Sequence, residues 1–330
     1  MRKALLIGID QYDNKDVGNL NGCKKDVDKL EKLLSYHYGN NEVAARPNFN
    51  CKTLKSSDTK KEKITRRKLR KEIKNFFEDD QADIALLYFS GHGYENSLGG
   101  YLVTQDASLY EEGMSFNDIM IYANNSTIKE IVIILDCCQS GHLGEVPTAN
   151  NHTVTLREGI SILTSSTATQ KSWENGVGGV FTGLLCNALG GGNADVLGCV
   201  TVAHLYEHAE KLLGPWEQRP IFRTNSCRLT ILRNAEPRIE FNILKKITTY
   251  FKGVDYSYKL DPAYEYTKDL GDKKKEKIFK HLQRMAGQGL VKPMDAEFMY
   301  FAAIESKYCV LTEFGKQYYR LIEKKLLKSV

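Results

Sequence analysis

The sequence predicts an α/β fold, in which a mostly parallel sheet carries helices on both faces, followed by a smaller α+β region. Over the first two thirds of the chain, short apolar runs alternate with amphipathic helical patterns. The two clearest runs, Ala85–Phe89 and Ile131–Leu135, have the continuous apolar character of buried parallel strands. Each ends at a turn of small residues. We therefore expect the chemistry of this chain at the carboxyl ends of these strands.

The expected elements follow the chain in order. Strands are predicted at 3–10, 49–55, 83–89, 130–136, 160–165 and 227–232. Helices are predicted at 23–38, 62–79, 116–124, 180–189 and 201–213. In these helical segments apolar residues recur at intervals of three and four, as Val27, Leu30 and Leu34 do in the first.

The charge balance changes near residue 236. Residues 1–237 hold 27 Lys and Arg against 29 Asp and Glu, whereas residues 238–330 hold 19 against 12. The basic character of the chain, formally +5, therefore belongs to its last part. We expect two domains, 1–235 and 236–330.

The second domain has its own pattern. Helices are predicted at 240–251 and 273–287, strand-like runs at 298–303 and 308–311, and a closing helix capped by Thr312. Helices followed by a β-hairpin resemble a winged helix.

Composition excludes several classes of protein. No stretch approaches the roughly 20 apolar residues of a membrane span. The apolar run Ala4–Ile9 ends at Asp10 and is too short for the core of a signal peptide. The eight cysteines form no CxxC pair. We expect a cytoplasmic protein with reduced thiols and no membrane partner.

Two strand ends offer reactive side chains. Phe89-Ser90-Gly91-His92-Gly93 ends one predicted strand, and Asp136-Cys137-Cys138-Gln139-Ser140-Gly141 ends another. A cysteine becomes a strong nucleophile as its thiolate, and an imidazole within hydrogen-bond reach can accept its proton. The histidine precedes the second cysteine by 46 residues. The sequence therefore predicts a Cys/His dyad at one edge of the sheet.

The two segments at these strand ends resemble sequence motifs of the caspase-like cysteine peptidases. They are most similar to the Ser-Gly-His-Gly and Asp-x-Cys-x-Ser-Gly motifs of the metacaspase and prokaryotic branch. The resemblance covers roughly residues 2–235 and includes Leu20–Val27, Gly179–Thr182 and Gln218–Pro220. It implies a caspase-like three-layer α/β/α sandwich. It also implies an endopeptidase that acts on proteins or peptides and requires no cofactor.

The resemblance assigns the catalytic roles. Cys138 is the nucleophile, because it is the cysteine followed by one residue and then Ser-Gly. We expect Cys137 to point to the other face of the strand end, since side chains alternate along a strand. His92 is the general base, and the backbone amides of Gly93 and Cys138 form the oxyanion hole.

The resemblance also assigns the pocket for the residue before the scissile bond. Asp136 and Ser90 each lie two residues before a catalytic residue, and Asp26 completes the set. A floor of carboxylates fits Arg or Lys and repels Asp. We therefore expect cleavage after basic residues.

Metal binding and self-cleavage are further expectations. Asp106, Asp118 and Glu145 match acidic positions with which many metacaspases bind calcium, so calcium is a candidate cofactor, although six to eight oxygen ligands are usual. Relatives with basic specificity often cleave themselves in the loop after the nucleophile, so Arg157 is the candidate site of autocleavage and Lys171 is a later alternative. The segment His204–His208 spells H-x-x-E-H, an inverted zinc-peptidase signature, but no third ligand is identifiable and we favour a plain helix.

The leading hypothesis is a cysteine endopeptidase that cleaves after Arg or Lys and serves as a regulated prokaryotic effector in stress or anti-phage defence. Its second domain, 236–330, would then receive an activating protein or small-molecule signal. One alternative is a DNA-binding winged-helix regulator in which the caspase-like domain is a sensor or scaffold. An inactive homologue is a third possibility, which the intact Cys138, His92 and Asp136 disfavour. Nucleic acid ranks below protein contact, because the basic cluster Lys273–Lys277 lies at the start of one predicted helix and not along it.

Overall fold

A computed structural model of the chain describes residues 1–39, 44–78, 81–96, 99–108, 111–137, 145–146, 153–165, 179–213, 219–265 and 272–327, with the backbone alone at 145–146 and 153–154. They form two compact units. The sheet unit comprises Met1–Ala194 and Cys199–Glu236, and the tail unit comprises Asp195–Gly198 and Pro237–Val330.

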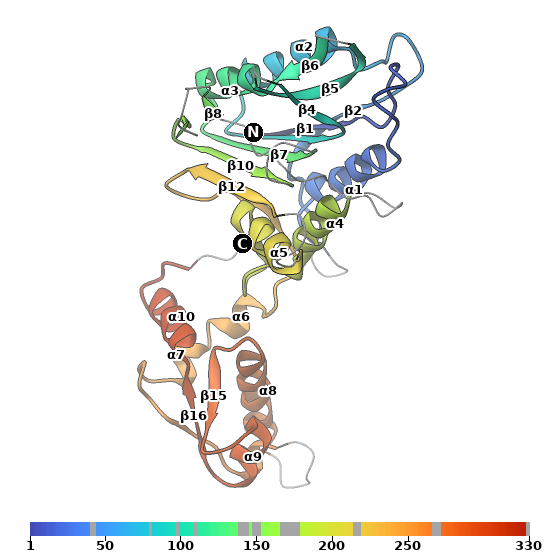
Figure 1. Cartoon of the computed structure of the whole chain (residues 1–330). Coiled ribbons are helices and arrows are strands. Elements are labelled where there is room, and N and C mark those ends of the chain that lie inside the picture. The colour runs from blue at the N-terminus through green and yellow to red at the C-terminus, as the bar shows by residue number, and fades with distance from the viewer. Residues whose placement is uncertain are drawn as a thin grey trace. The chain divides into compact units, whose positions relative to one another are not determined.

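A six-stranded sheet forms the centre of the sheet unit (Figure 1). Its strands, in spatial order, are β12 (Ile221–Asn225), β10 (Ile160–Thr164), β7 (Glu130–Asp136), β3 (Ile84–Ser90), β1 (Arg2–Gly8) and β2 (Asn50–Lys55). All neighbours pair in parallel except β12, which runs antiparallel to β10. The predicted mostly parallel sheet is confirmed.

Helices cover both faces of this sheet. On one face lie α2 (Arg66–Glu78) and α3 (Phe116–Asn125); on the other lie α1 (Cys23–Ser35), α4 (Val180–Asn187) and α5 (Val202–Leu212) (Figure 1). A π-helical turn, η2 (Ala188–Gly192), extends α4. Alternate residues of each strand enter two separate cores: Leu87 and Phe89 pack toward α2 and α3, while Leu86 and Tyr88 pack toward the other helices. The three-layer α/β/α prediction is correct.

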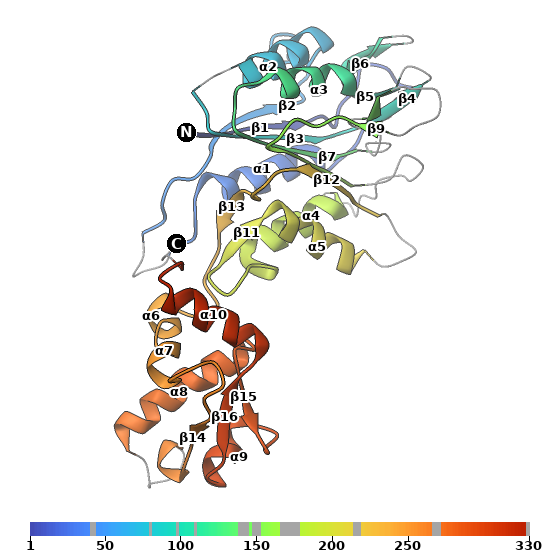
Figure 2. The same cartoon turned by 90° about the vertical axis from the view of Figure 1, so that its left-hand side faces the viewer.

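Among its described residues the sheet unit also has three small sheets, which were not predicted from the sequence. They are β4 (Gly93–Asn96), β5 (Gly99–Ser108) and β6 (Glu111–Ser115); β8 (Glu145–Val146) and β9 (Thr153–Val154); and β11 (Cys199–Thr201) and β13 (Ile231–Asn234). In Figure 2 the sheet of β4, β5 and β6 lies at the carboxyl end of the central strands. Since β3 of the central sheet ends at Ser90 and β4 begins at Gly93, the chain is held in a sheet on each side of the candidate base.

The predicted strand at 227–232 is wrong. The last strand of the central sheet is β12, and the extended residues after it form β13, which pairs with β11 instead. Between them the hydroxyls of Ser226 and Thr230 donate to the Glu130 carboxylate, at 3.1 and 3.3 Å. The edge strand β12 is only half-buried at best and includes a charged residue, so its apolar pattern is weak.

The tail unit is an α+β structure with its own core. Its elements are α6 (Phe241–Leu244), α7 (Ile247–Tyr250), β14 (Tyr258–Lys259), η3 (Pro262–Tyr264), α8 (Lys273–Gly287), β15 (Val291–Met294), α9 (Met299–Ile304), β16 (Tyr308–Leu311) and α10 (Glu313–Glu323). The three strands form an antiparallel sheet in the order β14-β16-β15. Helix α8 lies beside β15 in both views (Figures 1 and 2).

Several predictions for the tail are confirmed and two are wrong. The helix 273–287, the strand 308–311 and the Thr312 cap are confirmed, and the Thr312 hydroxyl accepts from Gly315 N–H at 3.0 Å. The predicted helix 240–251 is broken into α6 and α7. The predicted strand 298–303 is wrong, because Met299, Ala302 and Ala303 are buried at helical spacing and form α9.

No helix within the described ranges is long and apolar enough to cross a membrane. The seven cysteines that the structure describes carry free thiols.

Candidate active site

The candidate site lies where β3 and β7 end side by side. Ser90 and Asp136 are paired in register as the last residues of these strands, and the Gly91 amide donates to the Asp136 carbonyl at 3.3 Å. Cys137 is buried in the core beneath α2 and α3, on the face opposite to that of Ser90 and Asp136. Cys138, the predicted nucleophile, lies outside the described residues.

The geometry around His92 determines which of its ring nitrogens can act as a base. Its Nε2 lies 3.2 Å from the carbonyl oxygen of Gly18, and a carbonyl can only accept a hydrogen bond. Nε2 therefore carries the proton in the neutral ring, and Nδ1 is left as the acceptor. The Tyr12 ring lies 5.0 Å from the imidazole, and the Tyr12 hydroxyl accepts from the His92 backbone amide at 2.8 Å.

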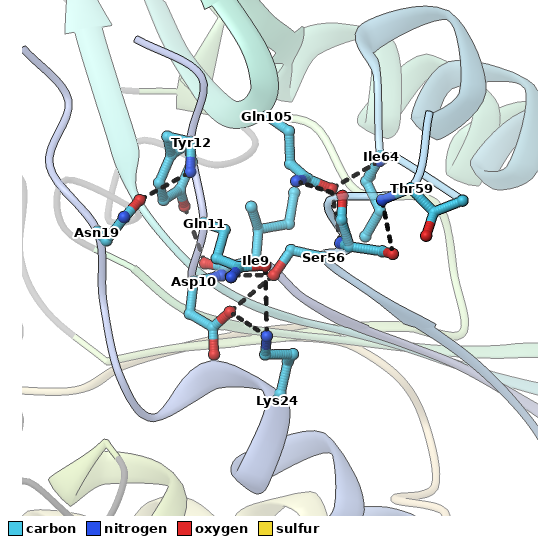
Figure 3. Close-up of polar contacts among 11 residues, drawn as sticks. Ile9, Asp10, Gln11, Tyr12, Asn19, Lys24, Ser56, Thr59, Ile64 and Gln105 are labelled. Atoms are coloured by element: carbon cyan, nitrogen blue, oxygen red, sulfur yellow. Dashed lines mark hydrogen bonds and ion pairs between the residues drawn. The ribbon is translucent and has the colours of Figure 1, made fainter. Parts of the chain in front are cut away.

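Both groups that orient His92 come from one loop, residues 9–22, which follows β1. A buried polar network, shown in Figure 3, anchors the start of this loop. The Ser56 hydroxyl donates to the Asp10 carboxylate at 2.7 Å and accepts from the Asp10 amide at 3.1 Å. Lys24 forms an ion pair with the same carboxylate at 3.2 Å. The network joins the loop to the end of β2 and the start of α1.

The side-chain amides of Asn19 and Gln105 extend this network (Figure 3). The side chain of Asn19 accepts from the Tyr12 amide at 2.9 Å, which closes the loop upon itself. The side chain of Gln105, which is 1% exposed, accepts from the Ile64 amide at 2.8 Å, while its carbonyl accepts from the Asp13 amide, also at 2.8 Å. The loop is thus fixed to β5 as well as to β2.

Two carboxylates meet beside the strand ends. Asp26, in the first turn of α1, is 1% exposed, and Asp136 is 6% exposed. Asp26 Oδ2 accepts from the Gly179 amide at 2.9 Å. A Cβ added to Gly179 would lie 2.4 Å from Asp136 Oδ2 and 3.3 Å from Asp26 Oδ2. The backbone of Gly179, where α4 begins, therefore separates the two acidic groups, which form what we call the acidic pair.

A short relay of hydroxyls positions Asp136. The Thr182 hydroxyl donates to Asp136 Oδ2 at 2.6 Å, and the Thr182 amide donates to the same oxygen at 3.3 Å. Since that hydroxyl has only one proton to give, the Tyr88 hydroxyl, 2.6 Å away, must donate to Thr182. Asp136 and Asp26 both accept amides at the start of α4, where the helix dipole stabilises negative charge.

The surroundings of the acidic pair disfavour the ionised form of Asp26. Burial, and then the charge of Asp136, raise the pKa of Asp26 to about 6, opposed by the Gly179 amide and by Lys29. Lys29 Nζ approaches Asp26 Oδ1 at 3.6 Å, too far for a hydrogen bond, and within the described part of the chain this oxygen accepts none. Burial and both carboxylates also raise the pKa of Tyr88 well above its usual value.

Comparison with known proteins identifies the family. Residues 1–231 match the caspase domain. The chain belongs to the caspase family. The structure of caspase-1 from Spodoptera frugiperda is 16% identical, with a TM-score of 0.51, and the match covers 71% of this chain and 90% of that one. A search of curated proteins gave no match.

A second solved structure has the same fold. Protein GSU0716 from Geobacter sulfurreducens is 18% identical, with a TM-score of 0.50 over 71% of this chain and 97% of that one. At these identities the two structures show the fold alone, and the family match shows a caspase-like cysteine peptidase domain, which implies a hydrolase acting on proteins.

The candidate calcium ligands of this caspase-like domain have other partners. The Asp106 carboxylate accepts from the Arg66 amide at 2.9 Å and from Thr104 at 2.8 Å, and so caps α2. Asp118 forms an ion pair with Arg70 at 3.2 Å. The side chain of Glu145 lies outside the described atoms. Among the described residues no group of three or more His, Cys, Asp or Glu could hold a metal ion, and calcium stays a prediction.

The zinc-like segment lies on α5. Nδ1 of His204 accepts from the Thr201 amide at 3.2 Å while the Thr201 hydroxyl accepts from the His204 amide at 3.4 Å. This reciprocal pair is a capping box, and it occupies Nδ1 of one of the two histidines that the signature would use. The structure therefore gives His204 a local role in starting a helix.

Two further predicted residues have clear positions. Gly93 begins β4 opposite Leu102, directly after the candidate base. The Arg157 guanidinium donates to the carbonyls of Ala123, Ile128 and Glu158. Autocleavage at Arg157 would require this side chain to leave three acceptors. The oxyanion role of Gly93 and autocleavage at Arg157 both stay predictions.

Four residues of the caspase-like site have no role predicted from the sequence, namely Tyr12, Gly18, Gly179 and Thr182, although the family resemblance includes the segment Gly179–Thr182. Gly18 has a φ of +72°, which glycine adopts without strain, and it offers its carbonyl to His92. One unused sequence signal at these positions is the glycine in the loop after the first strand.

Proposed function

We propose that the chain is a cysteine endopeptidase that cleaves proteins on the carboxyl side of Arg or Lys. The observation that carries this proposal is the buried acidic pair at the carboxyl edge of the sheet. Asp136 ends β7, which pairs with β3, and the last residue of β3, Ser90, lies two residues before His92. Substrate recognition by two carboxylates and proton transfer by an oriented imidazole would then occur at one edge.

Charge supports the basic specificity. At an effective dielectric constant near 20, a cation about 4 Å from a carboxylate gains about 4 kcal/mol, and an anion loses as much. An Arg side chain presents five N–H donors, and Asp26 Oδ1 is an acceptor without a hydrogen bond among the described residues. An Asp side chain would add a third carboxylate to the site.

The proposed mechanism uses His92 Nδ1 as the base, because Nε2–H donates to Gly18. Nδ1 accepts the Cys138 thiol proton, and the thiolate attacks the carbonyl carbon of the scissile bond. The backbone amides of Gly93 and Cys138 donate to the oxyanion. The C–N bond breaks as the imidazolium protonates the leaving amine, and water, deprotonated by Nδ1, then hydrolyses the thioester and restores the thiol.

The wider role is also a proposal. The resemblance to prokaryotic caspase-like effectors supports regulated proteolysis in stress or anti-phage defence. The strand order β14-β16-β15, with α8 directly before β15, supports a winged-helix-like tail. As a separate compact unit, the tail is suited to receive an activating protein or small-molecule signal.

Single substitutions test the nucleophile and the base. Cys138→Ala and His92→Ala should each abolish cleavage of a fluorogenic Arg peptide, whereas Cys137→Ser should retain most of it. Thermal unfolding of each variant controls for folding, and parallel assays with calcium and with a chelator test the calcium prediction. Activity in Cys138→Ala that is lost in Cys137→Ser would reverse the assignment of the nucleophile.

A further inference from the structure

Helix α8 of the tail unit exposes one continuous row of cations. Lys273, Lys277, Lys280 and Arg284 are spaced four, three and four residues apart and are all exposed. This spacing places them on one face of a helix, which we call the basic face of α8. At 1.5 Å per residue the row is about 16 Å long. It differs from the cluster at one helix start that the sequence analysis expected.

The charged side chains of α8 are nearly all positive. The single acidic residue of α8, Glu276, is half-buried, and Lys275 turns to an ion pair with Asp261 at 2.6 Å. Arg284 pairs with Glu240 at 2.6 Å, so one cation at the end of the row is partly neutralised. Lys277 and Lys280 form the centre of the basic face.

A hollow of about 550 Å³ lies against the same face. It is lined by Ile243, Lys277, Lys280, His281, Gln283 and Arg284, from α6 and α8. Lys277, Lys280 and Arg284 give this hollow three cationic side chains. Burial, and then the charges of Lys246, Lys277 and Arg284, lower the pKa of His281. A recessed surface with several cations fits anionic groups, such as phosphates, that lie in a row.

We propose that the basic face of α8 binds duplex DNA, with the helix at the major groove and its cations on the phosphate backbone. The B-form major groove is about 12 Å wide and admits a helix, whereas that of duplex RNA is too narrow for side chains to read. Each cation that neutralises a phosphate releases counterions, which makes such binding strongly dependent on salt.

Two other anionic partners fit this face less well. A helix that binds a membrane surface keeps an apolar face free to enter the lipid. The apolar face of α8, with Phe279, Leu282 and Met285, is buried in the core of the tail unit. An acidic peptide would match the charge but does not repeat its charges at the regular intervals of a phosphate backbone.

The test measures binding of the full-length chain to a labelled DNA duplex of about 20 base pairs by fluorescence anisotropy. Lys277→Glu/Lys280→Glu should weaken binding at least tenfold at about 100 mM salt, and Lys277→Ala/Lys280→Ala should reduce the slope of log K against log salt by about two. Lys60→Glu/Lys61→Glu, which makes the same change of charge on exposed residues of the sheet unit, should bind as the wild type does.

The same assay can overturn the proposal. Absence of DNA binding by the wild type, or equal weakening by the two glutamate variants, would contradict it. Displacement by polyglutamate or by vesicles with anionic lipids, at equal charge and as effectively as by unlabelled DNA, would assign the face to a peptide or a membrane. Equal competition by duplex RNA would contradict docking in the groove. Peptidase activity does not enter this test, so it stands apart from the proposed function.

Discussion

Asp26 is a buried carboxylate whose ionisation works against folding. Its pKa in the folded chain is about 6, above the ordinary value of 3.8, so the folded state binds the extra proton between these values. The favourable contribution is therefore complete below about pH 4, declines as the pH rises to about 6, and is absent above that. At neutral pH the ionised Asp26 therefore does not stabilise the fold.

Asp26→Asn should separate stability from activity. Asparagine keeps an acceptor for the Gly179 amide and removes the buried charge, so above pH 6 the free energy of unfolding should rise by about 1–3 kcal/mol. The kcat/KM for Arg peptides should fall at least tenfold, because one anionic partner is lost. Denaturant unfolding and peptide assays at pH 7.5 measure both quantities.

Asp28→Asn is the matched control, since this carboxylate of the same helix is more exposed and pairs with Lys55. It should neither stabilise the chain nor change the preference for Arg. A stabilised Asp26→Asn variant with unchanged activity would show that Asp26 does not contact the substrate.

Gly179 limits the space between the two carboxylates. In Gly179→Ala the new Cβ would lie 2.4 Å from Asp136 Oδ2, which forces the acidic pair to move. We expect a tenfold or greater loss in kcat/KM for Arg peptides. Gly183→Ala, in the same helix with open space around its Cα, should be silent or slightly stabilising. Equal activity of the two variants would contradict the assigned position of the pair.

The alternation of side chains along a strand predicts the face on which some of the site residues lie. Ser90 and Asp136 lie on the face opposite to Cys137 for this reason. The contacts of Tyr12, Gly18, Gly179 and Thr182 join segments that are remote in sequence, such as Tyr88 and Thr182. No local pattern encodes such contacts, because they depend on how helices and loops pack over the finished sheet.

At the scale of elements, the loop after β1 is the structure that orients His92. Ser56→Ala removes the hydroxyl that both donates to and accepts from Asp10, and leaves a buried amide unsatisfied. The free energy of unfolding should fall by about 1–3 kcal/mol, and kcat should fall because the Gly18 carbonyl is no longer held in place. Denaturant titration and peptide turnover test this pair of effects.

Ser57→Ala is the adjacent control. Its hydroxyl donates to the exposed Glu62, so the same truncation should change the free energy of unfolding little. If Ser56→Ala lowered stability without any change in kcat, the loop would not position the base.

Elements whose apolar residues recur with a clear period were predictable from the sequence. Elements whose apolar pattern fits both a helix and a strand were not. Helix 273–287 was predicted because its apolar residues follow a helical period, and in the structure the Asp272 side chain caps its start. The run that begins at Phe298 is apolar on nearly every residue, so strand and helix patterns fit it equally until packing buries one helical face. The central strands were found because burial on both faces makes them continuously apolar.

At the scale of the whole molecule, the two units have separate cores, so the peptidase should not need the tail for its chemistry. A chain that ends at Glu236 retains β13, whose residue Asn234 bonds to Tyr38 and His37 of the sheet unit. It should cleave small Arg peptides with a kcat within a few fold of the complete chain. Complete loss of activity with a cooperative thermal transition would show that the tail contributes directly to the site.

The central claim is that a buried acidic pair beside a Cys/His dyad makes this chain a peptidase for basic residues. Its most direct test is kcat/KM for three matched fluorogenic peptides, with Arg, Lys or Asp before the scissile bond, on the wild type and Asp136→Asn. Cleavage after Arg or Lys should exceed cleavage after Asp by at least a hundredfold, and Asp136→Asn should lose most of that difference. Preference for Asp, or an Asp136→Asn variant as selective as the wild type, would contradict the account.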